Sequence, residues 1–189
     1  MIDDAALRAV LDPVPSAFDL RADLRLAAVL VPWIVQDGAD HLLLTRRRED
    51  LPQHPGQISF PGGAREGDED PVSCALRESE EEIGIDARRV VVLGSLPPRV
   101  SIGGFWVHVI VGRVPADVVL RPDPREVASV RAWPLAVLRD PTRWQERAPA
   151  IDPARRPMPH LDWEGETLWG LTARFVLDLC GRCYPRAPR

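Results

Sequence analysis

A glutamate-rich segment ending at Ile83 most constrains how this chain of 189 residues can fold. Four glutamates fall within the five positions from Glu78 to Glu82. Just before them, Asp70 is a favourable N-cap and Pro71 suits the first helical position. Gly84 suits the left-handed residue beyond a helix end. The sequence therefore predicts a helix from about Pro71 to Ile83.

Helical geometry divides this segment into faces. At roughly 100° per residue, one stripe holds the residues predicted to face the core, which are Val72, Leu76, Ser79 and Ile83. Glu78, Glu81 and Glu82 lie together on an adjoining face, because the i, i+3, i+4 spacing makes side chains neighbours. Glu80 projects elsewhere and is predicted to be solvated.

These glutamates allow two interpretations, a solvated helix surface or a metal site. Acidic residues near a helix C-terminus oppose the helix dipole, and like charges at i, i+4 add to the penalty. The chain contains no lysine, and Arg77 is the one basic residue within the segment. A hard divalent cation removes the conflict, since it prefers carboxylate oxygens. We favour the metal site.

The segment from Gly63 to Ile85 resembles the signature of the Nudix hydrolases, G-x5-E-x7-R-E-U-x-E-E-x-G-U, in which U is aliphatic. The matching residues are Gly63, Glu69, Arg77, Glu78, Glu81, Glu82, Gly84 and Ile85. Ser79 stands where an aliphatic residue is usual. The resemblance implies the Nudix fold of the α/β class. In that fold a mixed β-sheet lies between α-helices, and a loop–helix–loop platform holds a metal-bound diphosphate.

The resemblance also implies roles for individual residues. Glu78 and Glu82 would be the principal ligands of Mg²⁺ or Mn²⁺, with Glu81 a third and the Gly63 carbonyl a candidate fourth. Within the catalytic machinery, Arg77 would pair with Glu69 and brace the loop against the helix. The reaction would be attack of water on one phosphorus of a diphosphate. Two candidates stand for the general base, Glu81 and the downstream Glu126.

The stretch from Leu43 to Gly63 is similar to a second pattern, found in coenzyme A pyrophosphatases: L-L-T-x-R-[SA]-x3-R-x3-G-x3-F-P-G-G. The matching residues are Leu43, Leu44, Thr45, Arg47, Gly56, Phe60, Pro61, Gly62 and Gly63. Arg48 replaces the small residue, and Pro52 replaces the second arginine. Further similarity at Gly104–Gly112, Glu126-Val127 and Leu168–Ala173 extends the resemblance from about Leu24 to Leu179.

This second resemblance implies that the substrate is coenzyme A or an acylated or oxidised form of it. Arg47, Gly62 and Gly63 would then bind the substrate. Another nucleoside diphosphate derivative, such as ADP-ribose, NADH or a nucleoside triphosphate, remains an alternative substrate. A binding module without turnover is a third interpretation. The crowded like charges at Glu78, Glu81 and Glu82 argue against that module, because a retired site has no reason to keep them.

Other candidates are weaker. Arginine suits bidentate phosphate contacts, and we expect this role for Arg47, whereas for Arg46 and Arg48 a solvated strand edge is favoured. His54 alone is weak evidence for a phosphate contact. The tryptophans Trp106, Trp133, Trp144, Trp163 and Trp169 are interpreted mainly as packing residues. The C-x-x-C pair at Cys180 and Cys183 lacks a second cluster for zinc and is interpreted as structural.

The whole chain is predicted to be a single domain over residues 1–189, with a core of about 24–180 and an N-terminal extension of 1–20. The net charge of −4 gives no field that would recruit nucleic acid. No apolar run reaches the roughly 20 residues of a membrane span, and the acidic N-terminus does not resemble a signal peptide. We therefore expect a cytoplasmic protein with a small-molecule diphosphate substrate. The sequence leaves the oligomeric state open.

The remaining elements follow from hydrophobic runs and turn residues. An opening helix is predicted at Asp3–Leu11, and the apolar run at Leu24–Val35 is predicted to be a strand pair or a buried strand, interrupted at Pro32. Strands are predicted at His41–Arg46, Val90–Leu96, Phe105–Val114 and Val127–Trp133, with a break at Pro97-Pro98. A short helix at Pro134–Arg139, a proline-rich loop as far as Pro159, a hairpin turn at Glu164-Gly165 and a closing helix at Leu171–Cys183 complete a mixed α/β domain.

Overall fold

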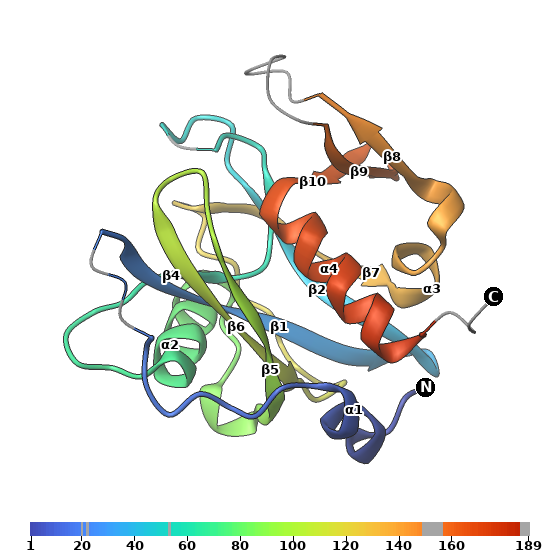
Figure 1. The fold of residues 1–189 in the computed structure, drawn as a ribbon. Coiled ribbons are helices and arrows are strands. Elements are labelled where there is room, and N and C mark those ends of the chain that lie inside the picture. The colour runs from blue at the N-terminus through green and yellow to red at the C-terminus, as the bar shows by residue number, and fades with distance from the viewer. Residues whose placement is uncertain (20, 22, 53, 149–156, 186–189) are drawn as a thin grey trace.

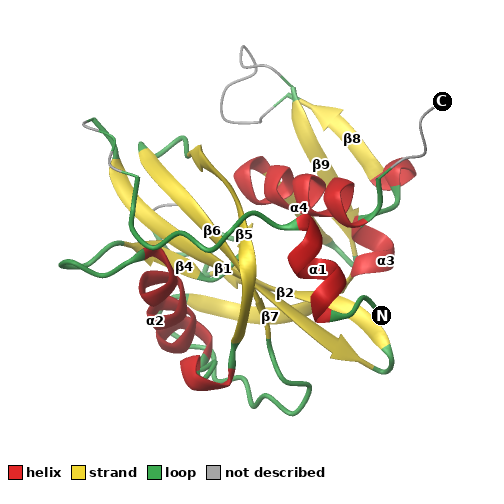
Figure 2. Cartoon of the chain, turned by 60° about the horizontal axis from the view of Figure 1, so that its bottom comes forward, coloured by secondary structure: helices red, strands yellow, loops and turns green. Residues whose placement is uncertain are grey.

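The computed structural model describes residues 1–19, 21, 23–52, 54–148 and 157–185. A seven-stranded mixed sheet forms the centre, with helix α2 (Pro71–Ile83) on one face (Figure 1). Helices α1 (Asp4–Val10) and α4 (Gly170–Cys183) lie together on the other face (Figure 2). The predicted fold class is confirmed.

The large sheet runs in the order β3-β2-β1-β6-β5, while β4 pairs with β1 and β7 pairs with β2. Its strands are β1 (Arg25–Gln36), β2 (Ala39–Arg47), β3 (Ile58–Ser59), β4 (Gly62–Ala64), β5 (Val91–Val100), β6 (Phe105–Arg113) and β7 (Val127–Pro134). The β1–β6 pair is parallel and the other pairs are antiparallel.

The predicted interruption at Pro32 is wrong, because β1 is continuous through it. On one side of β1, the pairing with β4 ends at Val29 and the pairing with β2 begins at Trp33. Pro32 falls in the gap between them, where its missing N–H removes no ladder hydrogen bond on that side. One long strand therefore pairs first with β4 and then with β2 along the same side.

The predicted break at Pro97-Pro98 is also wrong. Strand β5 continues through both prolines to Val100, with a shift of register between Leu96 and Arg99. Since β5 is the last strand in the sheet order, an unpaired edge and a bulge accommodate the prolines. The extended strand places Arg99 opposite Val107 of β6.

A second sheet of three strands occupies part of the region predicted as loop. It consists of β8 (Trp144–Arg147), β9 (Met158–Trp163) and β10 (Glu166–Trp169), in the order β10-β9-β8. Helix α3 (Leu135–Leu138) and 3-10 turns at Ala87–Arg89 and Pro141–Arg143 complete the described elements. The loop prediction is therefore wrong where the structure describes the chain, and residues 149–156 lie outside the described residues. The predicted turn at Glu164-Gly165 is confirmed, with φ angles of 48° and 80°.

Two apolar clusters fill the two faces of the large sheet. One includes Leu7 of α1 with Phe175 and Val176 of α4, and the other includes Ala75 and Ile83 of α2. Each helix therefore buries one side against the sheet and leaves its remaining side free to present polar groups. Among the described residues, no helix is long and apolar enough to cross a lipid bilayer.

Candidate active site

Helix α2 begins and ends at the predicted residues. The Asp70 carboxylate accepts hydrogen bonds from the N–H groups of Val72 (2.8 Å) and Ser73 (3.0 Å). At the other end, Gly84 adopts φ 74°, a left-handed conformation that suits glycine. These caps fix where the glutamate side chains stand relative to the preceding loop.

The core face of α2 agrees with the prediction at Ser79 and Ile83, which are fully buried, and differs at other positions. Cys74 and Ala75 are fully buried, whereas Val72 and Leu76 are only partly buried. Because small side chains face the sheet, the helix packs directly on β1 and β4. The buried face extends to Glu82, which is 8% exposed, so one acidic side chain of the cluster points into the protein.

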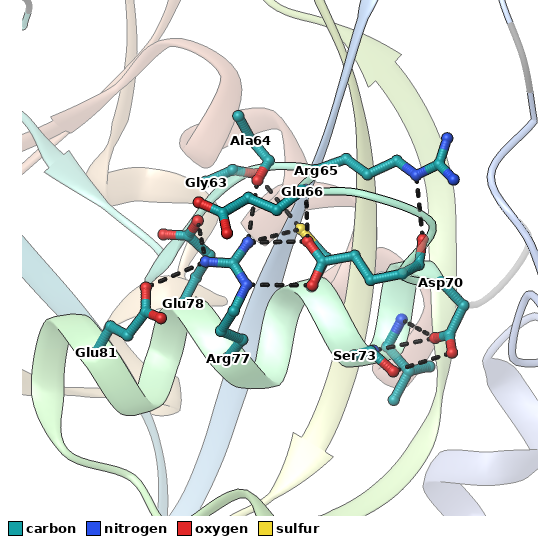
Figure 3. A network of polar contacts seen from close by, with 12 residues as sticks. Gly63, Ala64, Arg65, Glu66, Asp70, Ser73, Arg77, Glu78 and Glu81 are labelled. Atoms are coloured by element: carbon teal, nitrogen blue, oxygen red, sulfur yellow. Dashed lines mark hydrogen bonds and ion pairs between the residues drawn. The ribbon is translucent and has the colours of Figure 1, made fainter.

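Arg77 sits at the centre of an ion-pair network (Figure 3). Its guanidinium binds both oxygens of Glu69, with Nη2–Oε1 at 2.8 Å and Nε–Oε2 at 3.1 Å. The same group donates to Glu78 (2.9 Å) and Glu81 (3.1 Å) through Nη1 and to the Ala64 carbonyl (3.1 Å) through Nη2. The predicted Arg77–Glu69 pair is confirmed. It ties the loop after β4 to the second half of α2.

Glu78 lies against the Gly63 backbone. A Cβ atom added at Gly63 would approach the Glu78 carboxylate to 2.4 Å, a distance that real Cβ atoms do not tolerate. Burial raises the pKa of Glu78, and the Arg77 guanidinium opposes that effect. Glycine at position 63 therefore leaves the space that the Glu78 carboxylate occupies.

Glu82 accepts a hydrogen bond from the Gly62 N–H at 3.2 Å. Burial raises the pKa of Glu82 to about 7, and the negative charges of Glu78 and Glu126 contribute to that rise. The Gly62 N–H and the positive charge of Arg47 act in the opposite direction. One hydrogen bond and one nearby positive charge offset little of the unfavourable burial of this carboxylate, so a bound cation would stabilise it.

Glu126 and Glu81 differ in where they act. The loop before β7 bonds to the end of α2, since the Asp123 N–H donates to the Glu82 carbonyl at 2.8 Å. This contact brings the Glu126 charge close enough to raise the pKa values of Glu78 and Glu82. The Glu81 side chain is 59% exposed and pairs with Arg77. Of the two candidate bases, Glu126 has a charge that acts on both Glu78 and Glu82, whereas Glu81 faces solvent.

The donor set fits a divalent cation, although the described side chains do not surround one. Within the described ranges, no group of three His, Cys, Asp or Glu side chains is arranged to hold a metal ion. The recorded bonds use one oxygen of each buried acid, Oε1 of Glu78 and Oε2 of Glu82. The remaining carboxylate oxygens and the Gly63 backbone supply the oxygen ligands that hard cations prefer. To become a further ligand, the Glu81 side chain would have to break its ion pair with Arg77.

A cavity of about 860 Å³ lies next to this cluster, on the sheet face that α4 covers. Gly62, Gly63 and Ala64 of β4 line its edge, and Ala27 and Val107 line its floor. The turn between β5 and β6 and the first residues of α4 close the opposite side. The cavity therefore begins at Gly62 and Gly63, against which Glu82 and Glu78 lie, and extends across the sheet, although none of the glutamates of α2 lines it.

Three of the residues predicted to bind substrate, Arg47, Gly62 and Gly63, line this cavity together with His54. A register shift between Arg46 and Arg47 accompanies their different directions. Arg46 instead pairs with Glu49 at 2.6 Å, and Arg48 pairs with Asp50 at 2.6 Å. Arg47 therefore faces the cavity, whereas Arg46 and Arg48 form ion pairs with nearby acids. This division agrees with the prediction, which set Arg47 apart from its two neighbours.

Gly62 permits the closest backbone approach at the cavity edge. Its φ of 152° is one that L side chains rarely adopt, and an added Cβ would lie 2.4 Å from the Ala28 carbonyl oxygen and 2.5 Å from the Val29 Cα. Since both neighbours are backbone atoms, no side-chain movement could make room. Gly62 is therefore required by sheet geometry as well as by the candidate site.

Sequence reasoning missed two arginines that line the cavity, Arg99 on β5 and Arg174 on α4. Arg99 follows two prolines that were interpreted as a break, and Arg174 lies in the mainly apolar closing helix, so no motif marked either residue. Of the tryptophans, Trp169 lines the cavity and stacks on His160, with ring centroids 5.9 Å apart. Cys180 and Cys183 are free thiols, and burial raises their pKa values to about 12 and about 11.

Comparison with known proteins places this arrangement in a family. The NUDIX domain profile matches residues 24–153. A protein of Pectobacterium atrosepticum called uncharacterized Nudix hydrolase NudL is 41% identical over 160 residues, which cover 82% of this chain and 81% of that protein. A protein of the same name from Yersinia pestis is also 41% identical over 160 residues, with 82% and 78% covered. The chain therefore belongs to the Nudix hydrolase family.

Solved structures agree on the fold. The Nudix hydrolase RenU of M. smegmatis shares 25% identity, a TM-score of 0.52, and coverage of 59% of this chain and 71% of that chain. A MutT/nudix family protein from Enterococcus faecalis has a TM-score of 0.53 at 16% identity, with 87% and 63% covered, which supports the fold alone. Nudix hydrolases generally use divalent metal ions, in agreement with the carboxylate and carbonyl oxygens gathered at α2.

Proposed function

We propose that this Nudix hydrolase cleaves the diphosphate bond of coenzyme A or of its acyl or oxidised forms. The products would be 3′,5′-ADP and 4′-phosphopantetheine or its derivative. The observation that carries the proposal is the cavity that reaches from the Gly62–Ala64 backbone, beside Glu78 and Glu82, to arginine side chains. The similarity of Leu43–Gly63 to the pattern of coenzyme A pyrophosphatases supports the choice of substrate.

The position of each residue suggests its role in binding the metal or the substrate. Glu78, Glu82 and the Gly63 carbonyl would hold Mg²⁺ or Mn²⁺, with Glu81 as a further ligand once it turns from Arg77. A divalent cation bound there supplies neutralisation of the diphosphate oxygens and acidification of the attacking water. The Gly62-Gly63 backbone and Arg47 would orient the diphosphate at the cavity edge, because both border the cavity beside Glu82.

Glu126 is the stronger candidate for the general base. The hydrogen bond between Asp123 and the Glu82 carbonyl holds its loop against the end of α2, and its charge acts on both buried acids. A base must reach the proton that it removes, and the attacking water would stand beside the cation held by Glu78 and Glu82. Glu81 would serve the cation and Arg77 instead. Arg77 contributes through Glu69, by holding the loop that carries Gly63 and Ala64.

A different nucleoside diphosphate derivative, such as ADP-ribose, NADH or a nucleoside triphosphate, is the alternative substrate. Pro52 favours this alternative, since it replaces an arginine of the coenzyme A pattern. A binding module without turnover is a weaker alternative, because Glu78 and Glu82 retain a burial that is unfavourable for charged groups.

Product identity separates these alternatives. The protein is incubated with Mg²⁺ or Mn²⁺ and with coenzyme A, ADP-ribose, NADH and a nucleoside triphosphate, and product masses are measured. Release of 3′,5′-ADP from coenzyme A faster than AMP from ADP-ribose is the expected result. Faster release of AMP would move the assignment to the alternative substrate, and binding without turnover would favour the module.

A further inference from the structure

Arginine side chains with an unsatisfied Nε–H group occur at two separate places in the cavity. Arg47 lies at the end of β2 and Arg99 near the end of β5, and both side chains line the cavity. The Nε atoms of both are buried, and neither has a hydrogen-bond partner among the residues that the structure describes. A buried N–H group without an acceptor is unfavourable. Each arginine therefore has a donor available for a ligand.

The register of the sheet measures how far Arg99 stands from the backbone of β4. Ala64 pairs with Ala27, Ala27 with Val107, and Val107 with Arg99. This row crosses β4, β1, β6 and β5, so it spans three strand spacings, or about 14 Å between the backbones at its ends. All four residues of the row line the cavity. A diphosphate held at Gly63 therefore leaves Arg99 for a different group of the ligand.

The present partner of Arg99 does not satisfy it fully. Its Nη2 lies 3.4 Å from Asp178 of α4, a long contact, while Asp178 also pairs with Arg182 at 3.6 Å. The Arg99 side chain remains 41% exposed. The Asp178 carboxylate is thus shared by Arg99 and Arg182, and the Nε atom of Arg99 makes no hydrogen bond to it.

Two further positive features border the same end of the cavity. Arg174 lines it from the exposed side of α4, one turn before Asp178, and among the described residues no carboxylate pairs with it. Helix α4 also begins there, and its N-cap residue Trp169 provides no side-chain hydrogen bond to the first turn. The start of α4 and the β5–β6 hairpin lie at the same end of the molecule (Figure 1). Helix N-termini favour anions.

We infer that Arg99, assisted by Arg174, binds a phosphate monoester group that the substrate carries in addition to the scissile diphosphate. The inference rests on the proposed function and deepens it, because it assigns the residue that selects among diphosphates. The uncharged part of the substrate lies over Ala27 and Val107, between the backbone of β4 and Arg99. The enzyme therefore prefers diphosphates that carry a further phosphate.

The test compares coenzyme A with dephospho-coenzyme A, which lacks the 3′-phosphate and keeps the diphosphate. For the wild type, kcat/KM is expected to be higher for coenzyme A. The loss of one charge-assisted hydrogen bond weakens binding about 10- to 100-fold. Arg99→Gln should therefore lower kcat/KM for coenzyme A by that factor. The value for dephospho-coenzyme A should stay within about twofold of the wild type.

Asp178→Asn is the matched control. It removes the partner of Arg99 on α4 and keeps the arginine. If Arg99 only braces α4, Asp178→Asn reproduces the loss seen with Arg99→Gln, and the inference is overturned. If Arg99 contacts the phosphate, Asp178→Asn leaves the preference for coenzyme A intact or increases it. Arg88→Gln, at a side chain that is 90% exposed and remote from the cavity lining, should change neither substrate.

A binding measurement without metal separates this inference from the proposed function. Calorimetry compares adenosine 3′,5′-bisphosphate with AMP. The wild type should bind the bisphosphate about 10- to 100-fold more tightly, and Arg99→Gln should abolish the difference. If no diphosphate is turned over but this difference is present, the proposed function fails and the subsite stands. Equal binding of the two nucleotides, or equal turnover of the two coenzymes by the wild type, overturns the inference.

Discussion

The guanidinium of Arg77 binds both carboxylate oxygens of Glu69, eight residues earlier in the chain, at 2.8 and 3.1 Å. Such bidentate pairs fix orientation as well as distance. The hydrogen bonds to Arg77 lower the pKa of Glu69 to about 2. This pair determines where the loop after β4 stands relative to Glu78.

Glu69→Gln should lower the free energy of unfolding by about 1–3 kcal/mol at pH 7, because it leaves Arg77 with a weaker acceptor. The pKa of Glu69 is lower in the folded protein than its ordinary value of 4.5. Its stabilising contribution is therefore complete above pH 4.5 and is lost as the pH falls toward about 2. Urea unfolding as a function of pH measures the difference between variant and wild type.

Asp68→Asn is the control for that experiment, since Asp68 is fully exposed and lies 3.5 Å from Arg65. It should change stability by less than about 0.5 kcal/mol. A difference between Glu69→Gln and wild type that stays constant from pH 7 to pH 2 would contradict the assignment.

Glu82→Gln should abolish metal-dependent turnover while leaving the fold intact. The loss of a ligand charge removes several kcal/mol of transition-state stabilisation, or about 100-fold or more in kcat. The metal-free variant should be at least as stable as the wild type, since a buried charge becomes neutral. Steady-state kinetics and thermal unfolding with and without Mn²⁺ give both answers.

For Glu82→Gln, the control is Glu80→Gln on the same helix, at an exposed side chain. Saturating Mn²⁺ should raise the unfolding midpoint of the wild type and of Glu80→Gln, and should raise that of Glu82→Gln much less. A large fall in the stability of metal-free Glu82→Gln would contradict the prediction.

Gly63→Ala should disturb the metal site more than the fold. The added Cβ meets the Glu78 carboxylate at 2.4 Å, and a flexible side chain can move away where backbone could not. Displacement of Glu78 should weaken Mn²⁺ binding about 10- to 100-fold, as measured by titration calorimetry. Gly181→Ala on α4 is the control, because nothing lies within 4 Å of its added Cβ. Unchanged Mn²⁺ affinity in Gly63→Ala would exclude Glu78 from the site.

Glu126→Gln should lower kcat by about 10²- to 10⁴-fold if Glu126 is the general base, with Mn²⁺ affinity changed much less. Glu81→Gln should instead weaken Mn²⁺ binding or have a small effect, since Glu81 is exposed and pairs with Arg77. A larger loss of kcat in Glu81→Gln, with normal Mn²⁺ affinity, would assign the base to Glu81.

Local rules predicted the helix that carries the acids. Asp70, Pro71 and Gly84 act through contacts and backbone angles of their own segment, so the bounds of α2 could be derived without tertiary information. The exposed turn at Glu164-Gly165 is local in the same sense. The predictions at Pro32 and Pro97-Pro98 were wrong because the effect of a proline depends on which neighbouring strand needs its N–H.

The face that α2 buries was only partly predictable. Periodicity selected Val72 and Leu76, but the packed helix buries Cys74, Ala75 and Glu82. A hydrophobic stripe predicts that one face is covered, whereas the fit of small side chains against β1 and β4 determines the rotation. That rotation separates the buried Glu82 from the exposed Glu81.

By itself, the sequence determined the α/β class, the capped acidic helix and the family, because these depend on spacing within short segments. Tertiary structure alone decided which acids are buried, and it brought the loop of Glu126 against α2. It also placed Arg47 and Arg99, 52 positions apart in the chain, at two ends of one cavity. Sheet pairing joins strands regardless of their distance in sequence, so a site built across β4, β1, β6 and β5 leaves no local pattern to find.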